Sequence, residues 1–298
     1  TLWQWYLAWW ARAAYASGLL ASIAGGANIY HLSAERVRSL PIVVPILEQQ
    51  QRIADFLDAE VGQINNLINR KERLLELLEE RIDNLILGHV GASQLATPTA
   101  EVAPLPIRRL LSKVRRPPVP GDEVITAFRD GQVTARSLRR AEGYTLPAEA
   151  HGQGQHVEAG DVVIHGLDGF SGAIGTAEAA GNCSPVYHVC VPRKGGDSLF
   201  FGRLLRVLAT SGYLGLFAIS TRERAVDFRN WELFGRIPVP DVSNDEQSKI
   251  GSLISSVRPL RAAIERSNTL AKERKHALIT AAVTGQLDAS TARGADLS

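Results

Sequence analysis

The sequence predicts an α+β protein in which one complete α/β globular domain is joined to two long helices packed as an antiparallel coiled coil. The main observation is an internal repeat. Residues 40–57 and 237–254 follow one pattern at a fixed offset of 197, so that Pro41 corresponds to Pro238 and Gln50 to Gln247. Because this period is far too long for a solenoid, it indicates two copies of one module in one chain.

Both copies predict the same local structure. An extended, proline-containing segment is followed by a helix that begins at acidic and glutamine residues near 48 and 245, where acids favour the positive end of the helix dipole. Gly62 and Pro259 share one repeat position and predict a bend in both copies, with a second, longer helix after it. We expect a protruding spacer arm; the alternative is a helical hairpin that only contributes to the core.

Apolar spacing supports the helix pairing. The first copy has a seam spaced alternately by four and three residues, as in a coiled coil, at Ile64, Ile68, Lys71, Leu75, Leu78, Ile82 and Leu85. The seam of the second copy is weaker, with Leu260, Ile264, Leu270, Ala271, Ala277 and Leu278. Since each helix alone would expose an apolar stripe, packing against the other is the simplest arrangement.

The region between the two copies predicts a sheet domain. Runs rich in β-branched residues and bounded by glycine-rich turns predict strands over 123–128, 161–165, 173–177 and 186–191. Leucines at 204, 205 and 208 predict a helix within 200–217. The segment 92–104 has the composition of a linker.

The charge is unevenly distributed although the formal net charge is only +2. Residues 104–143 carry nine basic against four acidic residues and 193–236 carry eight against four, whereas 48–89 carries five against nine. This asymmetry indicates a polyanion partner for the globular part and a different role for the helices. The two cysteines, Cys183 and Cys190, provide no disulfide framework and favour a reducing, cytoplasmic compartment.

The order of several motifs resembles a known family. The motifs are Asp-Gly-Gln-Val-Thr at 130–134, the glycine-rich run at 160–175, Asn-Cys-Ser-Pro at 182–185 and Thr-Arg-Glu-Arg at 221–224, followed by the proline segment and the glutamine helix. Together with the duplication, they resemble a target recognition domain and the two helical spacers of the specificity subunit of type I restriction–modification systems. The resemblance covers nearly the whole chain.

The resemblance also implies a domain plan. Such subunits have two recognition domains, and this chain contains one complete copy and the end of another, with Tyr15–Ser33 matching the helix and loop that close a recognition domain. We therefore expect an N-terminally truncated or partial subunit. The expected segments are a remnant of the first recognition domain (1–40), a first spacer (41–91), a linker (92–104), a complete recognition domain (105–240), a second spacer (241–287) and a frayed tail (288–298).

In that family the subunit is not an enzyme and needs no cofactor. The resemblance implies that each recognition domain reads one half of a bipartite site on double-stranded DNA and that the helical arms set the spacing. Methyltransferase subunits dock on the arms, restriction and translocase subunits join the complex, and no membrane is involved. The arms also suggest a homodimer that rebuilds a two-domain reader.

Basic residues of the globular domain are the candidates for DNA contact, because Arg binds guanine edges bidentately and neutralises phosphates. Arg222 and Arg224 are the first pair, since they occupy a short polar loop; the alternative is a surface ion pair with Glu223. The others are Arg136, Arg139, Arg140, Arg193, Lys194, Asp168 and Ser171. Asp168 would accept a hydrogen bond from the cytosine amino group; the alternative is that it caps a turn. The glycine run at 166–175 would let the backbone approach DNA closely; the alternative is that it forms tight turns between strands.

The sequence allows three other interpretations. A zinc site from His165, Cys183, His188 and Cys190 lacks a close Cys-x-x-Cys pair, which favours a packed core and no metal. An enzyme with an unrecognised site would need clustered titratable residues. A membrane-associated or structural coiled-coil protein rests on the apolar run 2–27, which reads better as a buried helix.

Overall fold

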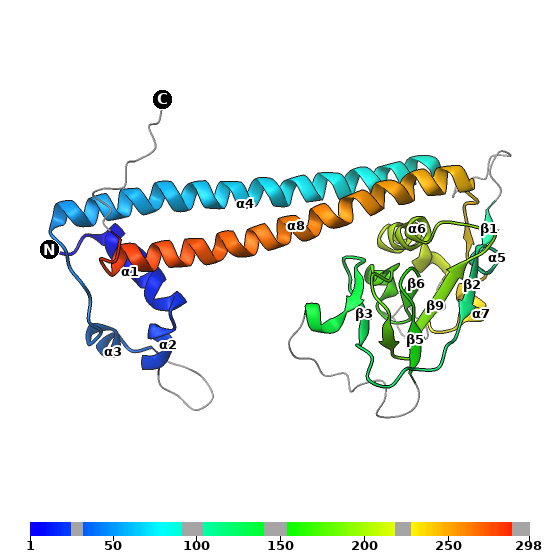
Figure 1. Cartoon of the computed structure of the whole chain (residues 1–298), viewed down its shortest axis with the longest axis horizontal. Coiled ribbons are helices and arrows are strands. Elements are labelled where there is room, and N and C mark those ends of the chain that lie inside the picture. The colour runs from blue at the N-terminus through cyan, green and yellow to red at the C-terminus, as the bar shows by residue number, and fades with distance from the viewer. Residues whose placement is uncertain (25–31, 91–103, 140–153, 218–227, 288–298) are drawn as a thin grey trace. The chain divides into compact units, whose positions relative to one another are not determined.

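A computed structural model describes residues 1–24, 32–90, 104–139, 154–217 and 228–287. It contains both helix and sheet, as predicted, and the chain divides into two compact units: Thr1–Glu76 with Leu260–Ser298, and Leu77–Pro259. The helices are α1 (Gln4–Ala16), α2 (Leu19–Ile23), α3 (Ala34–Arg38), α4 (Leu47–Val90), α5 (Ile107–Leu110), α6 (Ser198–Thr210), α7 (Trp231–Phe234) and α8 (Asn244–Val283). Figure 1 labels most of these elements.

The first unit is helical. One face of α1 buries Tyr6, Trp9 and Ala13 against the first turns of α4 and the last turns of α8 (Figure 1). The Tyr6 hydroxyl donates to the carbonyls of Val43 and Val283, at 2.8 and 3.2 Å. The N-terminal apolar run is therefore an amphipathic helix with a built packing surface, and among the described residues no helix is long and apolar enough to cross a membrane.

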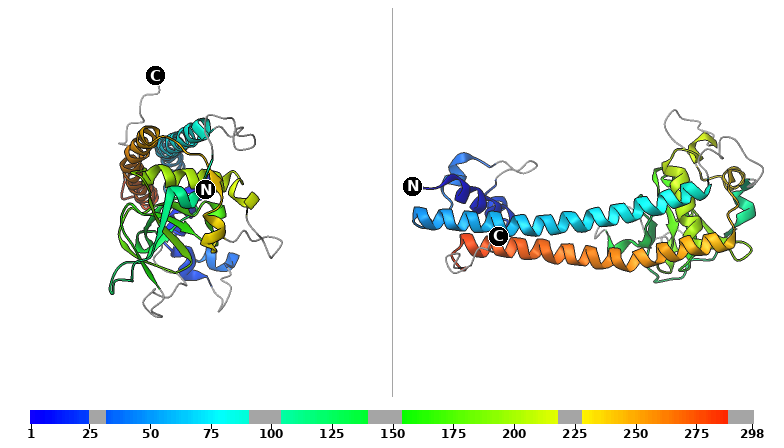
Figure 2. Two further views of the ribbon diagram at one scale, coloured as in Figure 1. Left: turned by 90° about the vertical axis from the view of Figure 1, so that its right-hand side faces the viewer. Right: turned by 90° about the horizontal axis from the view of Figure 1, so that it is seen from above.

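Within this unit α4 and α8 run antiparallel (Figure 2). Lys71 Nζ donates to Ser267 Oγ at 2.7 Å, and Lys275 Nζ donates to Asn65 Oδ1 at 3.1 Å. Residue numbers rise along α4 while those of the partners fall along α8, which is the register of an antiparallel pair. The predicted pairing of two long helices is confirmed, and the polar seam position Lys71 lies at this interface.

The prediction that a second helix begins after residues 62 and 259 is wrong. α4 and α8 each run as one helix through Gly62 and Pro259. A glycine costs a helix only about 1 kcal/mol, and buried neighbours such as Val257 and Ile264 hold the helix on both sides of the proline.

Part of the predicted seam is also wrong. Leu85 is exposed and Ile86 is buried instead, while Leu260 and Leu270 of the second copy are exposed and Asn268 is buried. A helix with 3.6 residues per turn drifts away from a strict seven-residue repeat, which moves the buried position by one residue.

The second unit is built around an antiparallel sheet with strand order β2-β9-β6-β7. Its strands are β2 (Leu111–Val114), β6 (Val162–His165), β7 (Ile174–Thr176) and β9 (Tyr187–Pro192). The pairs β3 (Ile125–Ala127) with β4 (Val133–Ala135), β5 (Gln155–Val157) with β8 (Gly181–Cys183), and β1 (Leu105–Pro106) with β10 (Pro238–Val239) are separate two-stranded ladders. The predicted strands at 123–128, 161–165, 173–177 and 186–191 correspond to β3, β6, β7 and β9.

Both faces of this sheet are covered. Val162 and Ile164 belong to the core formed with α6, α4 and α8, whereas Val163 between them belongs to the core formed with the β3–β4 and β5–β8 ladders. This explains why β6 has no polar alternation, since a strand that is buried on both faces is apolar throughout. The 3-10 helix η4 (Leu214–Phe217) follows α6 and accounts for the C-terminal part of the predicted 200–217 helix.

The two copies use their equivalent glutamines in the same way. Gln50 Oε1 accepts from the backbone N–H of Trp3, which caps α1, and Gln247 Oε1 accepts from that of Asp197, which caps α6, at 2.7 and 3.0 Å. Each glutamine also donates to a carbonyl five residues upstream. Both α1 and α6 have 13 residues and are followed by Ser-Gly with the glycine at positive φ. The repeat therefore extends to a helix held at its N-terminus by the spacer.

An ion-pair network joins α6 to α4 inside the second unit. Arg203 donates to Asp83 Oδ1 at 2.5 Å and to the carboxylate and backbone carbonyl of Glu79. The Arg203 side chain is only 11% exposed. Burying most of this guanidinium is tolerated because the two carboxylates offset the loss of its hydration.

Candidate nucleic-acid interface

The β3–β4 hairpin presents basic side chains at its tip. A hydrogen bond of 2.8 Å from the Phe128 N–H to the Gln132 carbonyl closes the hairpin turn. The turn contains Gly131 at φ 87°, a backbone conformation in which glycine carries no steric penalty. Arg129 lies in the turn with 71% of its side chain exposed. Arg139 stacks on the Phe128 ring at 4.4 Å and pairs with Asp130 at 2.7 Å.

The loop between β6 and β7 lies against this hairpin. A Cβ built on Gly172 would stand 2.5 Å from the Arg129 carbonyl, so the two segments are in backbone contact. Asp168 Oδ1 pairs with Arg129 Nη2 at 3.0 Å. Ser171 lies in the short helix η3 (Gly169–Ser171) of the same loop, beside the exposed Phe170.

The structure therefore brings together a part of the predicted set. Arg139, Asp168 and Ser171 lie on this hairpin-and-loop surface, and Arg136 starts η1 (Arg136–Leu138) directly after β4. Arg129 was missed by the sequence reasoning, although its place beside Asp-Gly in a predicted turn was the available signal.

Arg193 and Lys194 lie elsewhere. They follow the C-terminal end of β9, whereas the loop with Asp168 follows His165, which pairs with Tyr187 at the beginning of β9. Six strand residues separate the two ends, or roughly 20 Å at 3.3 Å per residue. Lys194 has φ 54° in a tight turn, and its carbonyl accepts from Asn244. These two residues form a second basic site at the opposite end of the sheet.

Arg140, Arg222 and Arg224 fall outside the described residues. Phe228 is the first described residue after the segment that contains Arg222 and Arg224. Its N–H donates to the Gly166 carbonyl at 2.8 Å, and its ring lies against Gly169. The chain thus re-enters the described structure at the β6–β7 loop, next to Asp168.

Two of the alternative readings can be compared with the geometry. The glycines of the 166–175 run make close intramolecular contacts: a Cβ on Gly175 would stand 2.0 Å from the Gly131 carbonyl. The Asp168 side chain does not cap η3 but pairs with Arg129. This favours tight packing over backbone approach to a ligand at the glycines, and charge pairing over turn capping at Asp168.

The cysteines lie in separate cores. Cys183 belongs to the cluster on the β3–β4 side and Cys190 to the cluster on the α6 side. Burial raises the pKa of the Cys183 thiol to about 12 and raises that of Cys190 further. Among the described residues no group of three His, Cys, Asp or Glu side chains is placed to hold a metal.

His165 organises the β6–β7 loop as a neutral side chain. Its Nδ1 accepts from the N–H groups of Leu167 and Asp168, at 3.1 and 2.9 Å, which requires a deprotonated Nδ1. Burial lowers the pKa of His165, although the Asp168 carboxylate opposes this shift.

We therefore expect stability to fall with decreasing pH. A histidine whose folded pKa lies below its unfolded value, near 6.5, takes up protons on unfolding, so its contribution is complete above that value and is lost as pH falls toward the folded pKa. Urea unfolding at pH 8 and pH 5.5 measures the loss. His165→Asn keeps a neutral acceptor for the same N–H groups and is expected to show a smaller loss, with His188, whose pKa is also lowered by burial, accounting for what remains. An unchanged pH dependence in the variant would contradict this role.

Comparison with known proteins bears on the first unit and on the fold. Residues 12–77 match the model of the family described as type I restriction modification DNA specificity domain. This segment is similar to the type I specificity domain. The match confirms the resemblance stated from the sequence, and it covers the segment from α1 to the middle of α4. No curated protein matches the chain.

Comparison with solved structures concerns the fold alone. A type I restriction-modification system S subunit from M. genitalium has 15% identity and a TM-score of 0.50, and the match covers 95% of this chain and 73% of that one. The HsdS subunit from Thermoanaerobacter tengcongensis has 15% identity and a TM-score of 0.46, with 95% and 70% covered. The match at residues 12–77 favours the type I specificity family over a structural coiled-coil protein.

Proposed function

We propose that this chain is a non-catalytic DNA-recognition subunit of a type I restriction–modification complex, and that its second unit reads one half of a bipartite site. The observation that carries the proposal is the repeated scaffold. The specificity-domain match includes Gln50, and the equivalent Gln247 holds α6 by the same hydrogen bonds. The sheet attached to α6 is then a recognition domain, with proposed bounds 105–240.

The hairpin-and-loop surface is the proposed reading face. Arg129 and Arg139 supply positive charge for phosphates, and Asp168 and Ser171 supply base-edge partners. The exposed Arg129–Asp168 pair costs little to open, since surface ion pairs stabilise by about 1 kcal/mol or less. DNA phosphates can therefore replace Asp168 as the partner of Arg129. Arg222 and Arg224 belong to the segment that ends beside this face at Phe228.

The helices are the proposed spacer. α4 contains 44 residues, or roughly 66 Å at 1.5 Å per residue. This is longer than one turn of B-DNA, about 34 Å. In this proposal the helix pair sets the gap between two half-sites, and the N-terminal segment 1–40 is the end of a first recognition domain. Methyltransferase subunits would dock on the helices, restriction and translocase subunits would join the complex, and homodimers through the helices would supply a second reader.

DNA binding tests the reading function. The full chain is titrated with a pool of randomised duplexes over a range of salt, with and without its methyltransferase subunit, and the bound duplexes are sequenced. We expect affinity to fall steeply with salt, because phosphate contacts release counterions, and a sequence preference that the partner strengthens. Replacing Arg222 and Arg224 with Ala should relax this preference by about tenfold, as expected when base contacts of about 1–3 kcal/mol are lost.

A matched control separates reading from general charge. Arg274→Ala removes an exposed arginine of α8 and should leave the sequence preference unchanged. Absence of any preference with the methyltransferase present would refute the reading function, and an equal loss in the control would assign Arg222 and Arg224 to general electrostatics.

The exposed apolar residues of α4 provide a test of docking. Leu67 and Leu74 are 51% and 46% exposed and lie seven residues apart on one face of the first unit. In this proposal these exposed leucines contact the methyltransferase subunit. Leu67→Asp with Leu74→Asp should weaken methyltransferase association by about 1,000-fold, since interface anchors contribute about 2 kcal/mol each, while thermal stability stays close to wild type. Association is measured by sedimentation, and unchanged association would move the docking surface elsewhere.

A further inference from the structure

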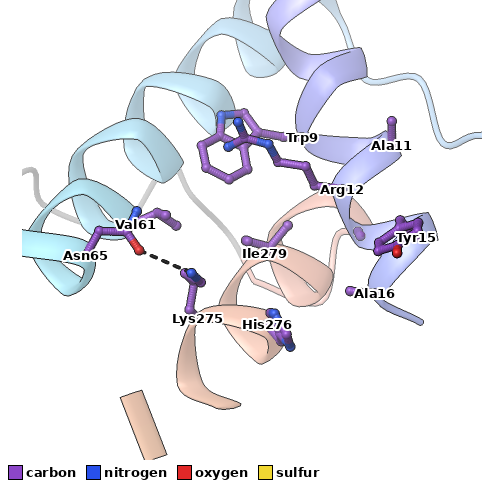
Figure 3. Close-up of a pocket in the computed structure, with 11 residues that line it drawn as sticks. Trp9, Ala11, Arg12, Tyr15, Ala16, Val61, Asn65, Lys275, His276 and Ile279 are labelled. Carbon is purple, nitrogen blue, oxygen red and sulfur yellow. Dashed lines mark hydrogen bonds between the residues drawn. The ribbon is translucent and has the colours of Figure 1, made fainter. Parts of the chain in front are cut away.

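A pocket of about 600 Å³ opens in the first unit between α1, α4 and α8. Trp9 and Ile279 form its buried floor, and Arg12, Tyr15, Lys275 and His276 line its sides (Figure 3). The floor is apolar and aromatic, and the sides carry basic groups from two helices. This combination suits an acid with an attached apolar group.

The basic residues of this pocket lack carboxylate partners. Its lining includes no Asp or Glu, and within the described part of the chain no ion pair involves Arg12, Lys275 or His276. Arg12 lies over the Trp9 ring at 4.6 Å from the centroid, and Lys275 donates to the neutral amide oxygen of Asn65 at 3.1 Å (Figure 3). Asp58, the nearby acid, accepts from Trp9 Nε1 at 3.1 Å and does not line the pocket.

The second copy of the scaffold has carboxylates at two positions where the first copy has basic residues. Aligning α1 with α6 at an offset of 194 puts Trp9 on Arg203 and Arg12 on Arg206. The C-terminal parts of α4 and α8 are aligned by the shared Glu-Arg pair at 80–81 and 273–274. This alignment puts His276 on Asp83 and Lys272 on Glu79. Asp83 and Glu79 bind Arg203 in the second unit. The first unit has positively charged or ionisable side chains where the second has the two acids.

From this difference we propose that the pocket binds the carboxylate of an external acid that carries an aromatic or aliphatic group. The carboxylate lies between Arg12, Lys275 and His276, and the apolar group lies on Trp9 and Tyr15. Arg12 is prepositioned by its stacking on Trp9, and guanidinium binds carboxylate bidentately. This site goes beyond the proposed DNA-reading function and does not depend on it.

Calorimetric titration of the full chain tests the proposal. The probes are 3-phenylpropionate and the blocked peptide Ac-Ala-Asp-Phe-Ala-NH2, each compared with its neutral amide counterpart, 3-phenylpropionamide or the Asn peptide. We expect saturable binding of the acids and about tenfold weaker binding of the amides, as for loss of a charge-assisted hydrogen bond. Tighter binding of the peptide identifies a protein side chain as the source of the carboxylate, and tighter binding of the free acid identifies a small metabolite.

Two variants make the assignment specific. His276→Asp restores the carboxylate that the second copy has at this position and should weaken acid binding by about tenfold, since an internal carboxylate now competes. Ala277→Asp adds the same charge at the neighbouring exposed position, outside the lining, and should change binding by less than about twofold at moderate salt.

The proposal would be overturned by equal binding of acid and amide, by equal effects of the two variants, or by no saturable binding of either acid by the wild-type chain. Preferential binding of inorganic phosphate or of duplex DNA over both acids would also overturn it, because the pocket would then be a phosphate site. Thermal unfolding of each variant verifies that the helices still pack.

Discussion

Replacing Arg203 with Met is expected to destabilise the second unit by about 3 kcal/mol, in the range found when one partner of a buried ion pair is removed. Arg203 is 11% exposed and binds Asp83 and Glu79 of α4. Without it, two partly buried carboxylates lose the guanidinium that they share. Urea unfolding followed by far-UV circular dichroism measures the change.

A second substitution distinguishes lost packing from unpaired charge. Adding Glu79→Gln and Asp83→Asn to Arg203→Met removes the two carboxylate charges as well. This should recover about 2 kcal/mol of the lost stability. Arg129→Ala opens an ion pair whose side chains are 71% and 43% exposed, and it should cost less than about 1 kcal/mol. If the triple variant is no more stable than Arg203→Met, then packing rather than charge explains the effect.

Replacing Gly175 with Ala is expected to cost about 3 kcal/mol or more, because overpacking against rigid backbone destabilises strongly. The new methyl group would stand 2.0 Å from the Gly131 carbonyl and 3.1 Å from Val133 Cγ2. The hairpin can relieve this clash only by moving away from β7. Since the hairpin carries Arg129 and Arg139, we also expect weaker DNA binding.

Gly215→Ala is the matched control in the same unit. A Cβ at Gly215 meets nothing within 4 Å, so its cost should stay within about 0.5 kcal/mol. Differential scanning calorimetry of both variants, combined with DNA titration, checks the prediction. A Gly175→Ala protein with wild-type stability would show that the hairpin is not held against β7.

The repeat, visible in the sequence, anticipated much of the scaffold. Proline and glutamine at a constant offset predicted two long helices and their pairing, and β-branched runs predicted β3, β6, β7 and β9. These predictions succeeded because helix periodicity and strand propensity are local properties. The short strands β4, β5 and β8 were missed, since a strand of three residues is too short to show an alternating pattern.

The spatial arrangement of the candidate interface could not be predicted from local sequence patterns. Arg139, Asp168 and Ser171 were identified one by one, but no sequence feature indicated that Asp168 pairs with Arg129, or that Arg193 and Lys194 lie at the opposite end of the sheet. These placements follow from the antiparallel register of β6 with β9 and from the backbone contact between Gly172 and Arg129.

By itself the sequence determined the duplication, the helical periodicity and the uneven charge, because each depends on residue type and spacing. The tertiary structure decided the rest. Only it showed that Gln50 and Gln247 hold equivalent helices, that Gly62 and Pro259 do not interrupt theirs, and that Arg203 pairs with Asp83 and Glu79. Hydrogen-bond partners, packing against a bend and charge pairing are set by residues distant in the chain, so they become visible only when the chain is folded.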